Sequence, residues 1–446
     1  MPQQTPYPFQ QVGAMFLAGR KRGMCCDVMG LGKTAQGIVA SDMVHATRIL
    51  VICPGGVRFN WLREFKRFSD TKHEFKLILT GKDKPLEKGV TVISYELAIR
   101  PATRKKLMSM YFDVLILDES HFLKTRDRKR TETVYGVHCK GDTGIISRAT
   151  HCWALTATPT PNHPGEIYSV LRAFGAWTQN YYAFEAKFCV VVEGDYGPKI
   201  VGMKNVEELK ELVRPIMIRR KIEEVMTDLP EVTFSDIVLE ATGIAHPEDV
   251  KDWRDAENNS NEGRKLKTRL QEVADENKLD LSDMHLPTLR RLTGLAKVRP
   301  VCELIMRELD SGLDKIVIFG EHRDVLEGVR ATLQKYGSQI IYGGNTAEVK
   351  QERIDKFINI YKYRVLVGHI KTLGTGVDGL QQVCNNGLFI ESSWTPSDNY
   401  QAVGRLRRTG QTRPVLFRFA SLADSLDEHV QRSNRRKTQI ISQLLD

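Results

Sequence analysis

A short glycine-rich stretch near the N-terminus has the composition of a phosphate-binding loop. Gly30 and Gly32 are followed at once by Lys33 and Thr34, and a helix is predicted over residues 35–45. Glycines let backbone N–H groups approach phosphate oxygens, and the positive end of the helix dipole adds to the attraction. Lys33 would reach the β- and γ-phosphates of a nucleotide, and the Thr34 hydroxyl would bind magnesium. The alternative is a glycine-rich turn that only caps the helix.

Two adjacent carboxylates, Asp118 and Glu119, stand at the carboxyl end of a strand predicted over residues 114–117. In an open parallel sheet, this edge is where ligands bind. Asp118 would hold a metal ion, and Glu119 would activate the attacking water. The alternative is a solvated acidic turn. The phosphate-loop pattern upstream disfavours that alternative, because each pattern supports the other.

Three arginines crowd into four residues near the C-terminus, namely Arg405, Arg407 and Arg408. Arginine stabilises the charge that spreads over a phosphoryl group during transfer. The spacing of Arg405 and Arg408 predicts that both lie on one helical face. A basic solvated helix and a contact with the DNA backbone are equally compatible with this spacing.

Two His–Cys pairs, His138-Cys139 and His151-Cys152, form a fourth pattern and are separated by eleven residues. Histidine and cysteine are the usual ligands of zinc. Adjacent ligands fit one tetrahedral ion poorly, however, and Cys152 leads into a predicted buried strand. We therefore favour a structural role for these residues over a zinc site.

These candidate residues need elements that bring them together, and the sequence predicts an α/β fold. Short continuous apolar runs are typical of parallel strands that helices cover on both faces. Such runs occur at 49–52, 114–117, 316–319, 365–367 and 388–390. Amphipathic helices are predicted between them, for example over 324–336 and 348–358. Because strands alternate with helices in two separate regions, we expect two α/β lobes.

The region from about residue 164 to 298 is charged and rich in helix-forming residues. The elements predicted there are surface helices over 206–226 and 262–276, a loop over 255–263 and a strand over 232–239. The predicted organisation is an N-terminal lobe (1–235) with a helical protrusion from about 164, a linker with a second helical segment (236–298) and a C-terminal lobe (299–446).

Taken in order along the chain, these patterns resemble the motifs of one family, the Swi/Snf-type ATPases of helicase superfamily two. The resemblance runs from about residue 7 to 430. In the first half it is carried by a Q motif at 7–13, motif I at 27–34, motif Ia at 53–65, motif Ib at 94–96, motif II at 118–121 and motif III at 155–162. In the second half it is carried by motif IV at 319–329, the segment 342–353, motif V at 374–380 and motif VI at 401–411. The family's helical protrusion and the stretch that leaves it resemble Arg214-Pro215, Arg219-Arg220 and Leu229-Pro230.

The resemblance implies two RecA-like lobes with ATP between them, which step along double-stranded or branched DNA without separating strands as a processive helicase does. Such a motor would remodel or anneal DNA or displace bound protein, with ATP and Mg²⁺ as cofactors. It would act as a monomer that could have protein partners. The catalytic residues implied are Lys33, Glu119, Arg405 and Arg408. The nucleotide-binding residues implied are Gln10, which would read adenine, and Gly30, Gly32, Lys33, Thr34, Gly376, Asp378 and Gln401. Magnesium would be held by Thr34 and Asp118.

The expected contacts with DNA are Gly55, Gly56, Ser94, Tyr95 and the basic stretch 124–130. Binding through phosphates would depend on salt and be insensitive to sequence. For the basic stretch, an exposed charged loop is the structural alternative.

A few positions depart from the expected patterns. Asp27 stands where the general phosphate-loop pattern has its first glycine. Within the family, Val28 replaces an acidic residue of motif I, and Val403-Gly404 replace the acidic pair of motif VI. Neither of the latter changes removes a phosphate or metal ligand, so activity is still expected. The sequence of residues 407–409, Arg-Arg-Thr, resembles the annealing-helicase branch more than the nucleosome remodellers.

Charge and composition agree with a nucleic-acid partner. The 446 residues carry a formal net charge of +10: residues 1–130 have 23 basic and 12 acidic side chains, 131–400 have 33 and 39, and 401–446 have 9 and 4. Basic ends around an acidic middle indicate a polyanionic partner. Scattered cysteines and the lack of a signal peptide or long apolar run predict an intracellular protein. It would lie in the cytoplasm of a bacterium or a virus-infected cell, or in a eukaryotic nucleus.

Three other functions remain open on the sequence alone. An RNA-stimulated ATPase would carry the same motifs. A non-catalytic, nucleotide-dependent clamp would not need Lys33, Glu119, Arg405 and Arg408 together. The motor subunit of a restriction or defence complex would need a partner for nuclease activity, because the two lobes and the insertion fill this chain.

Overall fold

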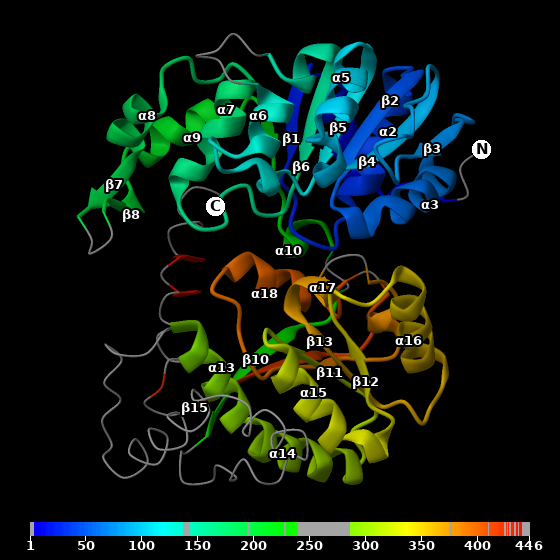
Figure 1. Ribbon diagram of the computed structural model, residues 1–446, viewed down its shortest axis with the longest axis vertical. Coiled ribbons are helices and arrows are strands. Elements are labelled where there is room, and N and C mark those ends of the chain that lie inside the picture. Colours follow the sequence, from blue (N-terminus) through cyan, green and yellow to red (C-terminus); the bar gives the residue numbers. More distant parts are fainter. Residues whose placement is uncertain are drawn as a thin grey trace. The chain divides into compact units, whose positions relative to one another are not determined.

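The buried strands predicted from the sequence form two separate parallel sheets (Figure 1). The computed structural model describes residues 4–136, 143–193, 197–226, 229–239, 286–374, 377–408 and 410–422, with single residues and pairs from 425 to 438. The chain divides into two units, Met1–Asp228 with Arg436–Asp446, and Leu229–Arg435. The first segment of this unit runs to Asp228, and the lobe boundary at residue 235 stays a prediction.

Within the described residues, the sheet of the first unit has seven strands, and all neighbouring strands are parallel. In spatial order they are β3 (Phe75–Leu77), β4 (Gly89–Ser94), β2 (Arg48–Cys53), β5 (Phe112–Asp118), β6 (Ala149–Leu155), β1 (Arg22–Cys25) and β9 (Met217–Ile218). Strands β5, β6 and β1 are neighbours, so their carboxyl ends meet at one edge of the sheet. This edge is where motifs II, III and I begin.

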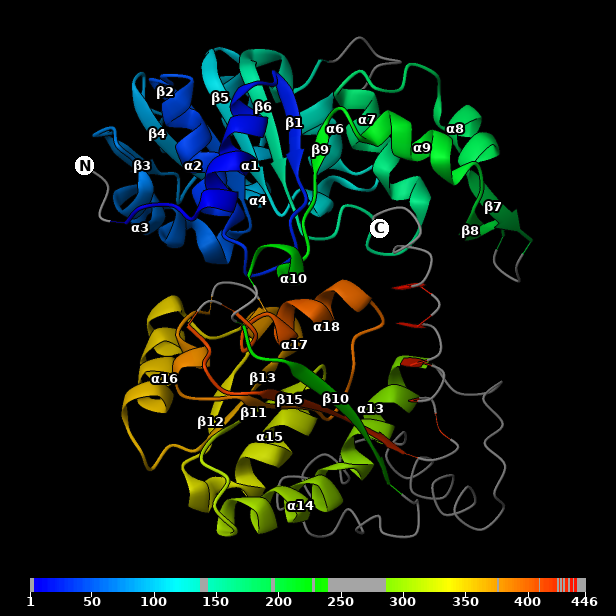
Figure 2. The same ribbon diagram turned by 180° about the vertical axis from the view of Figure 1, so that it is seen from behind.

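Helices cover both faces of this sheet. One face carries α1 (Pro8–Ala18), α2 (Lys33–Met43) and α3 (Arg58–Phe68), and the other α5 (Pro101–Met108), α6 (Lys129–Tyr135) and α7 (Tyr168–Ala173) (Figures 1 and 2). Along β2, Ile49 and Val51 pack in the core under α1, α2 and α3. Leu50 and Ile52 pack in the core on the opposite face, under α5, α6 and α7. Strand side chains alternate between faces, so a sheet buried on both sides needs continuous apolar runs.

The stretch after α7 contains more strand than the sequence predicts. Its elements are α8 (Tyr181–Phe188), the antiparallel pair β7 (Cys189–Val192) and β8 (Lys199–Met203), α9 (Val206–Val213), β9 and α10 (Ile222–Val225). The prediction of one helix over 206–226 is confirmed for Val206–Val213 and Ile222–Val225 and is wrong for the residues between them. Pro215 cannot continue a helix, and Met217 and Ile218 then pair with β1 at the sheet edge.

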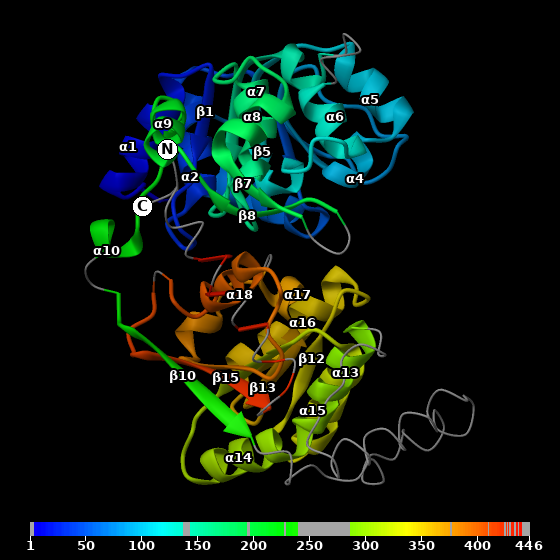
Figure 3. The same ribbon diagram turned by 90° about the vertical axis from the view of Figure 1, so that its left-hand side faces the viewer.

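The second unit repeats the architecture. In spatial order its parallel strands are β10 (Val232–Leu239), β15 (Val415–Leu422), β14 (Asn386–Phe389), β11 (Ile316–Gly320), β13 (Val365–His369) and β12 (Gln339–Ile341). One face carries α13 (Leu286–Ala296), α14 (Val298–Asp310) and α15 (Arg323–Thr332), and the other α16 (Ala347–Asn359), α17 (Ile370–Gly374) and α18 (Pro396–Val403). The predicted strand over 232–239 is confirmed as β10, which lies beside β15 at the sheet edge (Figure 3).

The predicted α/β class, with two lobes of parallel strands flanked by helices, is confirmed. The helix predicted over 262–276 and the loop predicted over 255–263 lie outside the described residues. None of the described helices combines the length and hydrophobicity that crossing a membrane requires.

Candidate nucleotide-binding site

The predicted phosphate loop connects β1 to α2. The strand ends at Cys25, and the helix begins at Lys33 rather than at residue 35. Gly30 and Gly32 have φ angles of 89° and 69°, which residues with a side chain rarely adopt. These glycines, Lys33 and Thr34 therefore come together in a tight turn that opens an eleven-residue helix.

Two side chains form hydrogen bonds with the main chain of this loop. The family resemblance assigns both of them to nucleotide binding. Lys33 Nζ donates to the main-chain oxygens of Asp27 (2.8 Å) and Val28 (3.3 Å). Gln10 is buried on α1, and its Nε2 donates to the main-chain oxygen of Leu31 (3.2 Å). Helix α1 is thus tied to the phosphate loop, while the reading of adenine by Gln10 stays a prediction.

The acidic pair follows β5 on the same sheet edge. Trp61 Nε1 donates to Asp118 Oδ2 (2.8 Å), and the backbone N–H of Glu119 donates to Asp118 Oδ1 (3.0 Å). Burial, together with the adjacent Glu119 carboxylate, raises the pKa of Asp118 to about 7. A divalent cation would favour the ionised form, and carboxylate and hydroxyl oxygens are the ligands that magnesium prefers. Asp118 and Thr34 therefore fit the predicted magnesium site.

Glu119 is held in an unusual backbone conformation. Its φ of 47° is rare for a residue other than glycine, and such conformations cluster at functional sites. Its Oε2 lies 3.2 Å from His121 Nδ1, which is also 3.1 Å from the Thr156 hydroxyl. Since Thr156 directly follows β6, His121 joins the ends of motifs II and III.

The motif Ib residues have internal roles. The Tyr95 hydroxyl donates to the main-chain oxygen of Asp118 (2.9 Å), and the Ser94 hydroxyl accepts from a backbone N–H of α4 (Tyr95–Ala98). Both side chains are buried, and the expectation that the loop with Ser94 and Tyr95 contacts DNA stays a prediction. Of the motif Ia glycines also expected to contact DNA, Gly56 is exposed and Gly55 partly so.

The predicted arginine pair belongs to the second unit and follows α18. The prediction that Arg405 and Arg408 share one helical face is wrong. Helix α18 ends at Val403, and Gly404, a poor helix former, leads into a series of turns.

The turns nevertheless bring motifs V and VI together. Arg405 donates through Nε to the main-chain oxygen of Gly374 (2.9 Å) and through Nη1 to that of Val377 (2.9 Å). Arg408 Nη1 lies 3.1 Å from Asp378 Oδ1. Three of the predicted site residues, Arg405, Arg408 and Asp378, therefore lie in one cluster.

The other two predicted residues of the second unit are less informative. Gln401 is buried on α18, where its Cβ lies close to the backbone of Gly374. Gly376 lies outside the described residues. A nucleotide-binding role for either stays a prediction.

The structure describes only one of the two His–Cys pairs that were considered as zinc ligands. His138 and Cys139 lie outside the described residues. Cys152 is fully buried within β6, and burial raises the pKa of its thiol to about 12. Within the described part of the chain, no group of three or more His, Cys, Asp or Glu side chains is arranged to hold a metal.

The basic stretch 124–130 is partly engaged within the first unit. Lys124 Nζ lies 2.8 Å from Glu166 Oε1, and the Arg126 guanidinium lies 4.1 Å from the Tyr181 ring centre. Arg128 and Lys129 are exposed. These two residues are the better candidates for contacts with DNA phosphates.

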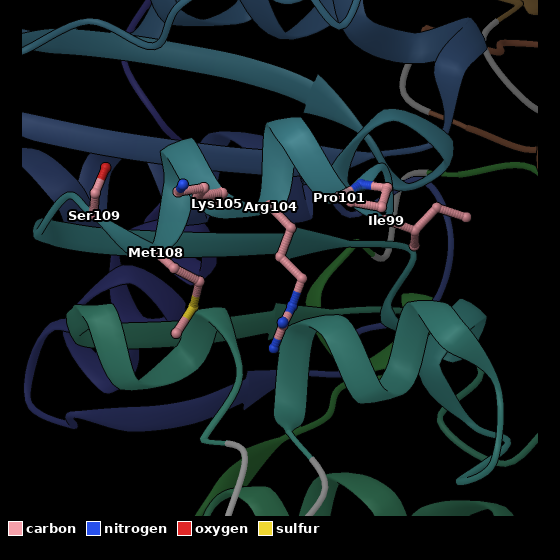
Figure 4. A pocket seen from close by; sticks show the side chains of 6 residues that line it. All are labelled: Ile99, Pro101, Arg104, Lys105, Met108 and Ser109. Atoms are coloured by element: carbon pink, nitrogen blue, oxygen red, sulfur yellow. The ribbon is translucent and has the colours of Figure 1, made fainter.

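A surface pocket of about 580 Å³ lies along α5, apart from the motifs (Figure 4). Its lining consists of Ile99, Pro101, Arg104, Lys105, Met108 and Ser109. None of these belongs to the predicted site, and the basic groups come from a single helix. The pocket therefore has no part in the chemistry of the nucleotide site.

Two α/β units, with a phosphate loop and an acidic pair at the same edge of one parallel sheet, are the elements of a nucleotide-binding protein. A SNF2-related domain matches residues 9–243, and a helicase conserved C-terminal domain matches residues 296–410. The first match alone covers more than half of the chain. The chain belongs to the SNF2-related family, which confirms the resemblance seen in the motifs.

Proteins that are similar in sequence agree with this family assignment. The chain is 29% identical to the SWI/SNF-related matrix-associated actin-dependent regulator of chromatin subfamily A-like protein 1 of Xenopus tropicalis, over 98% of this chain and 44% of the relative. It is 25% identical to the human DNA annealing helicase and endonuclease ZRANB3, over 98% of this chain and 40% of the relative. The chain thus spans less than half the length of these relatives.

A solved structure is also similar, the Sulfolobus solfataricus SWI2/SNF2 ATPase core in complex with dsDNA. It covers 99% of this chain and 94% of its own, with 23% sequence identity and a TM-score of 0.46.

Proposed function

We propose that this chain is a DNA-stimulated ATPase that moves along double-stranded DNA and remodels or anneals it, or displaces bound protein. Three adjacent strands, β5, β6 and β1, lead at one sheet edge to Asp118, to Thr156 and to the loop before Lys33, and this arrangement carries the proposal. Membership of the SNF2-related family supports the same activity.

In this proposal the first unit binds ATP and prepares the attacking water. The loop with Gly30 and Gly32 offers its backbone N–H groups to the phosphates, and Lys33 turns from the loop carbonyls to the β- and γ-phosphates. Magnesium, when bound by Thr34 and Asp118, neutralises phosphate charge. Glu119 accepts the proton of the attacking water, and its contact with His121 fixes the direction of its carboxylate.

Arg405 and Arg408 supply positive charge to the phosphoryl group during transfer. Catalysis of this kind is mostly positioning and electrostatics, so these arginines should act on the rate more than on nucleotide affinity. Arg408 would exchange its ion pair with Asp378 for a contact with the phosphate.

The proposed track is duplex or branched DNA, contacted through its phosphates. Support comes from the basic excess of residues 1–130 and from the exposed Arg128 and Lys129. One relative is named a DNA annealing helicase, in line with the predicted branch of the family. The frog and human relatives are animal proteins, so the expected bacterial or viral source has no support from them.

The test is ATP hydrolysis with forked DNA, plain duplex, single-stranded DNA and RNA. Duplex or forked DNA should stimulate hydrolysis most, and Lys33→Ala should abolish it. Lys21→Ala, which changes an exposed lysine before β1, is the matched control. Stimulation by RNA alone would favour the RNA-dependent alternative, and no stimulation by any nucleic acid would refute the proposal.

A further inference from the structure

The chain leaving the first unit pairs directly with the phosphate loop. This part of the chain is residues 216–220, and unit 2 begins shortly afterwards at Leu229. The backbone N–H groups of Met24, Cys26 and Val28 donate to the main-chain oxygens of Ile216 (2.6 Å), Ile218 (2.7 Å) and Arg220 (3.1 Å), respectively. The pairing of β1 with β9, visible in Figure 2, thus continues past the end of β1 into the loop.

Arg220 adds a side-chain clamp at the end of this pairing. Its Nε lies 3.1 Å from Asp27 Oδ1, and its Nη2 lies 2.5 Å from Asp27 Oδ2. Its Nη2 also donates to Gln36 Oε1 (2.8 Å), and its Nη1 donates to the main-chain oxygen of Phe9. One guanidinium therefore joins the phosphate loop, α2 and α1.

Asp27 has no access to solvent and depends on this clamp. Its Oδ2 also accepts a hydrogen bond from the buried Gln36 Nε2 (2.8 Å), while its main-chain oxygen accepts from Lys33 Nζ (2.8 Å). A buried carboxylate is costly unless it is paired and hydrogen-bonded. Because Asp27 replaces the first glycine of the general phosphate-loop pattern, this loop needs a cation from elsewhere in the chain, and Arg220 supplies it.

Two neighbours reinforce the arrangement. Arg219 Nη1 donates to the main-chain oxygens of Cys26 (3.0 Å) and Ala157 (3.1 Å), which joins the ends of motifs I and III. At Gly13, a Cβ would lie 1.8 Å from Gln36 Oε1 and 2.7 Å from Arg220 Nη2. Only glycine lets α1 approach the clamp this closely.

We propose that Arg220 is a positioning residue for ATP binding, acting through Asp27 to hold the phosphate loop in its nucleotide-binding shape. The proposal rests on the proposed ATPase function and extends it to a residue 193 positions from the loop that it positions. Without Arg220, the Asp27 carboxylate is unpaired beside Lys33. It then competes with the phosphates for the lysine and repels them, so ATP affinity falls while the catalytic groups Glu119 and Arg408 are untouched.

The first experiment measures the affinity of a fluorescent ATP analogue without DNA, and kcat and KM for ATP with duplex DNA, for Arg220→Gln. The analogue's Kd and the KM should rise about tenfold or more, with kcat changed by less than about threefold. Arg214→Gln is the matched control, because Arg214 is an exposed arginine of the same region that pairs with Glu211. Affinity equal to wild type in a folded Arg220→Gln protein would overturn the proposal.

The double variant Asp27→Asn/Arg220→Gln separates positioning from general stability. Removing both charges leaves no unpaired carboxylate, so the double variant should bind the analogue several-fold more tightly than Arg220→Gln alone. A double variant that binds no better would refute the role of Asp27. If Arg220→Gln does not fold in a thermal unfolding assay, Arg220→Lys, which keeps the charge without the two-pronged geometry, should show the same loss of affinity in weaker form. Unchanged affinity in that variant would then overturn the proposal.

The binding measurement needs neither DNA nor hydrolysis. A wild-type protein that binds the analogue but shows no DNA-stimulated hydrolysis would therefore contradict the proposed function and leave the comparison of affinities valid.

Discussion

The charged groups of the candidate site are held in different ways in the two units. In the first unit, Asp27 and Asp118 are fixed by side-chain partners from distant parts of the chain, Arg220 and Trp61. In the second unit, Arg405 bonds main-chain oxygens, and Arg408 faces Asp378, whose side chain is 61% exposed.

This difference indicates that the site residues of the first unit hold a fixed geometry, whereas Arg408 of the second unit can change its partner. Buried side-chain partners hold one geometry, as a binding site for phosphates and metal requires. An ion pair whose carboxylate is largely in solvent contributes about 0–1 kcal/mol, so Arg408 can exchange Asp378 for a phosphate at little cost. Substitutions in the two units test this contrast, from the largest expected effect to the smallest.

Arg408→Ala should lower kcat about 10³-fold, because an arginine that meets the transferring phosphoryl group acts mainly in the transition state. The midpoint of thermal unfolding should hardly change, since the carboxylate left behind, that of Asp378, is 61% exposed and can be solvated by water. Arg413→Ala, which removes another partly exposed arginine of the second unit, is the control for both measurements. A normal rate of hydrolysis with DNA present would remove Arg408 from the catalytic set.

Trp61→Phe should raise the magnesium concentration needed for half-maximal hydrolysis about tenfold, because the indole N–H that orients Asp118 is lost. Trp153→Phe makes the same chemical change at a buried tryptophan that bonds the main-chain oxygen of Arg20 instead. A magnesium titration in which both variants shift equally would contradict a specific link between Trp61 and the metal site.

Asp118→Asn should raise the thermal unfolding temperature in metal-free buffer, and more at pH 8 than at pH 5. The folded pKa of Asp118, about 7, is above the ordinary value of 3.8, so stability is lost as the pH rises from 3.8 towards 7. Asparagine removes this loss. An equal gain at the two pH values would show that ionisation of Asp118 does not destabilise the fold.

Asp113→Asn is the control of opposite sign. Partial burial acts to raise the pKa of Asp113, but hydrogen bonds from Arg48 and Thr47 lower this pKa overall. Its ionised form therefore stabilises the fold above the unfolded pKa, and asparagine should lower the unfolding temperature at pH 8.

Asp378→Asn should change kcat by less than about threefold, the smallest effect in the series, because an exposed partner adds little to the position of Arg408. DNA-stimulated hydrolysis measures it, with Arg408→Ala in the same assay as reference. A loss as large as that of Arg408→Ala would make the second unit as rigidly arranged as the first.

Local patterns in the sequence were sufficient to predict the main strands and the phosphate loop. Continuous apolar runs mark strands buried on both faces, and Gly30 and Gly32 mark a turn that needs positive φ. The two-residue strand β9 has no such pattern, because its place depends on the open edge of β1. The helix expected through Arg408 stops early because Gly404 interrupts it.

The partners that hold the candidate site could not be predicted from spacing. Trp61 reaches Asp118 across 57 positions, and Arg220 reaches Asp27 across 193. Both pairs arise from strand order, which no local window of sequence contains. The one available signal was Asp27 itself, since an acidic residue in a buried phosphate loop requires a cationic partner.

The pairing of β9 with β1 also has a consequence for synthesis of the chain. Until the ribosome has added residues 216–220, the backbone N–H groups of Met24, Cys26 and Val28 lack the partners that they have in the folded unit. A nascent chain that ends earlier presents an open strand edge next to an incomplete phosphate loop, and such edges promote aggregation. The part of the candidate nucleotide site that lies in the first unit, although its predicted groups come from residues 10–119, is completed only after nearly half of the chain has been made.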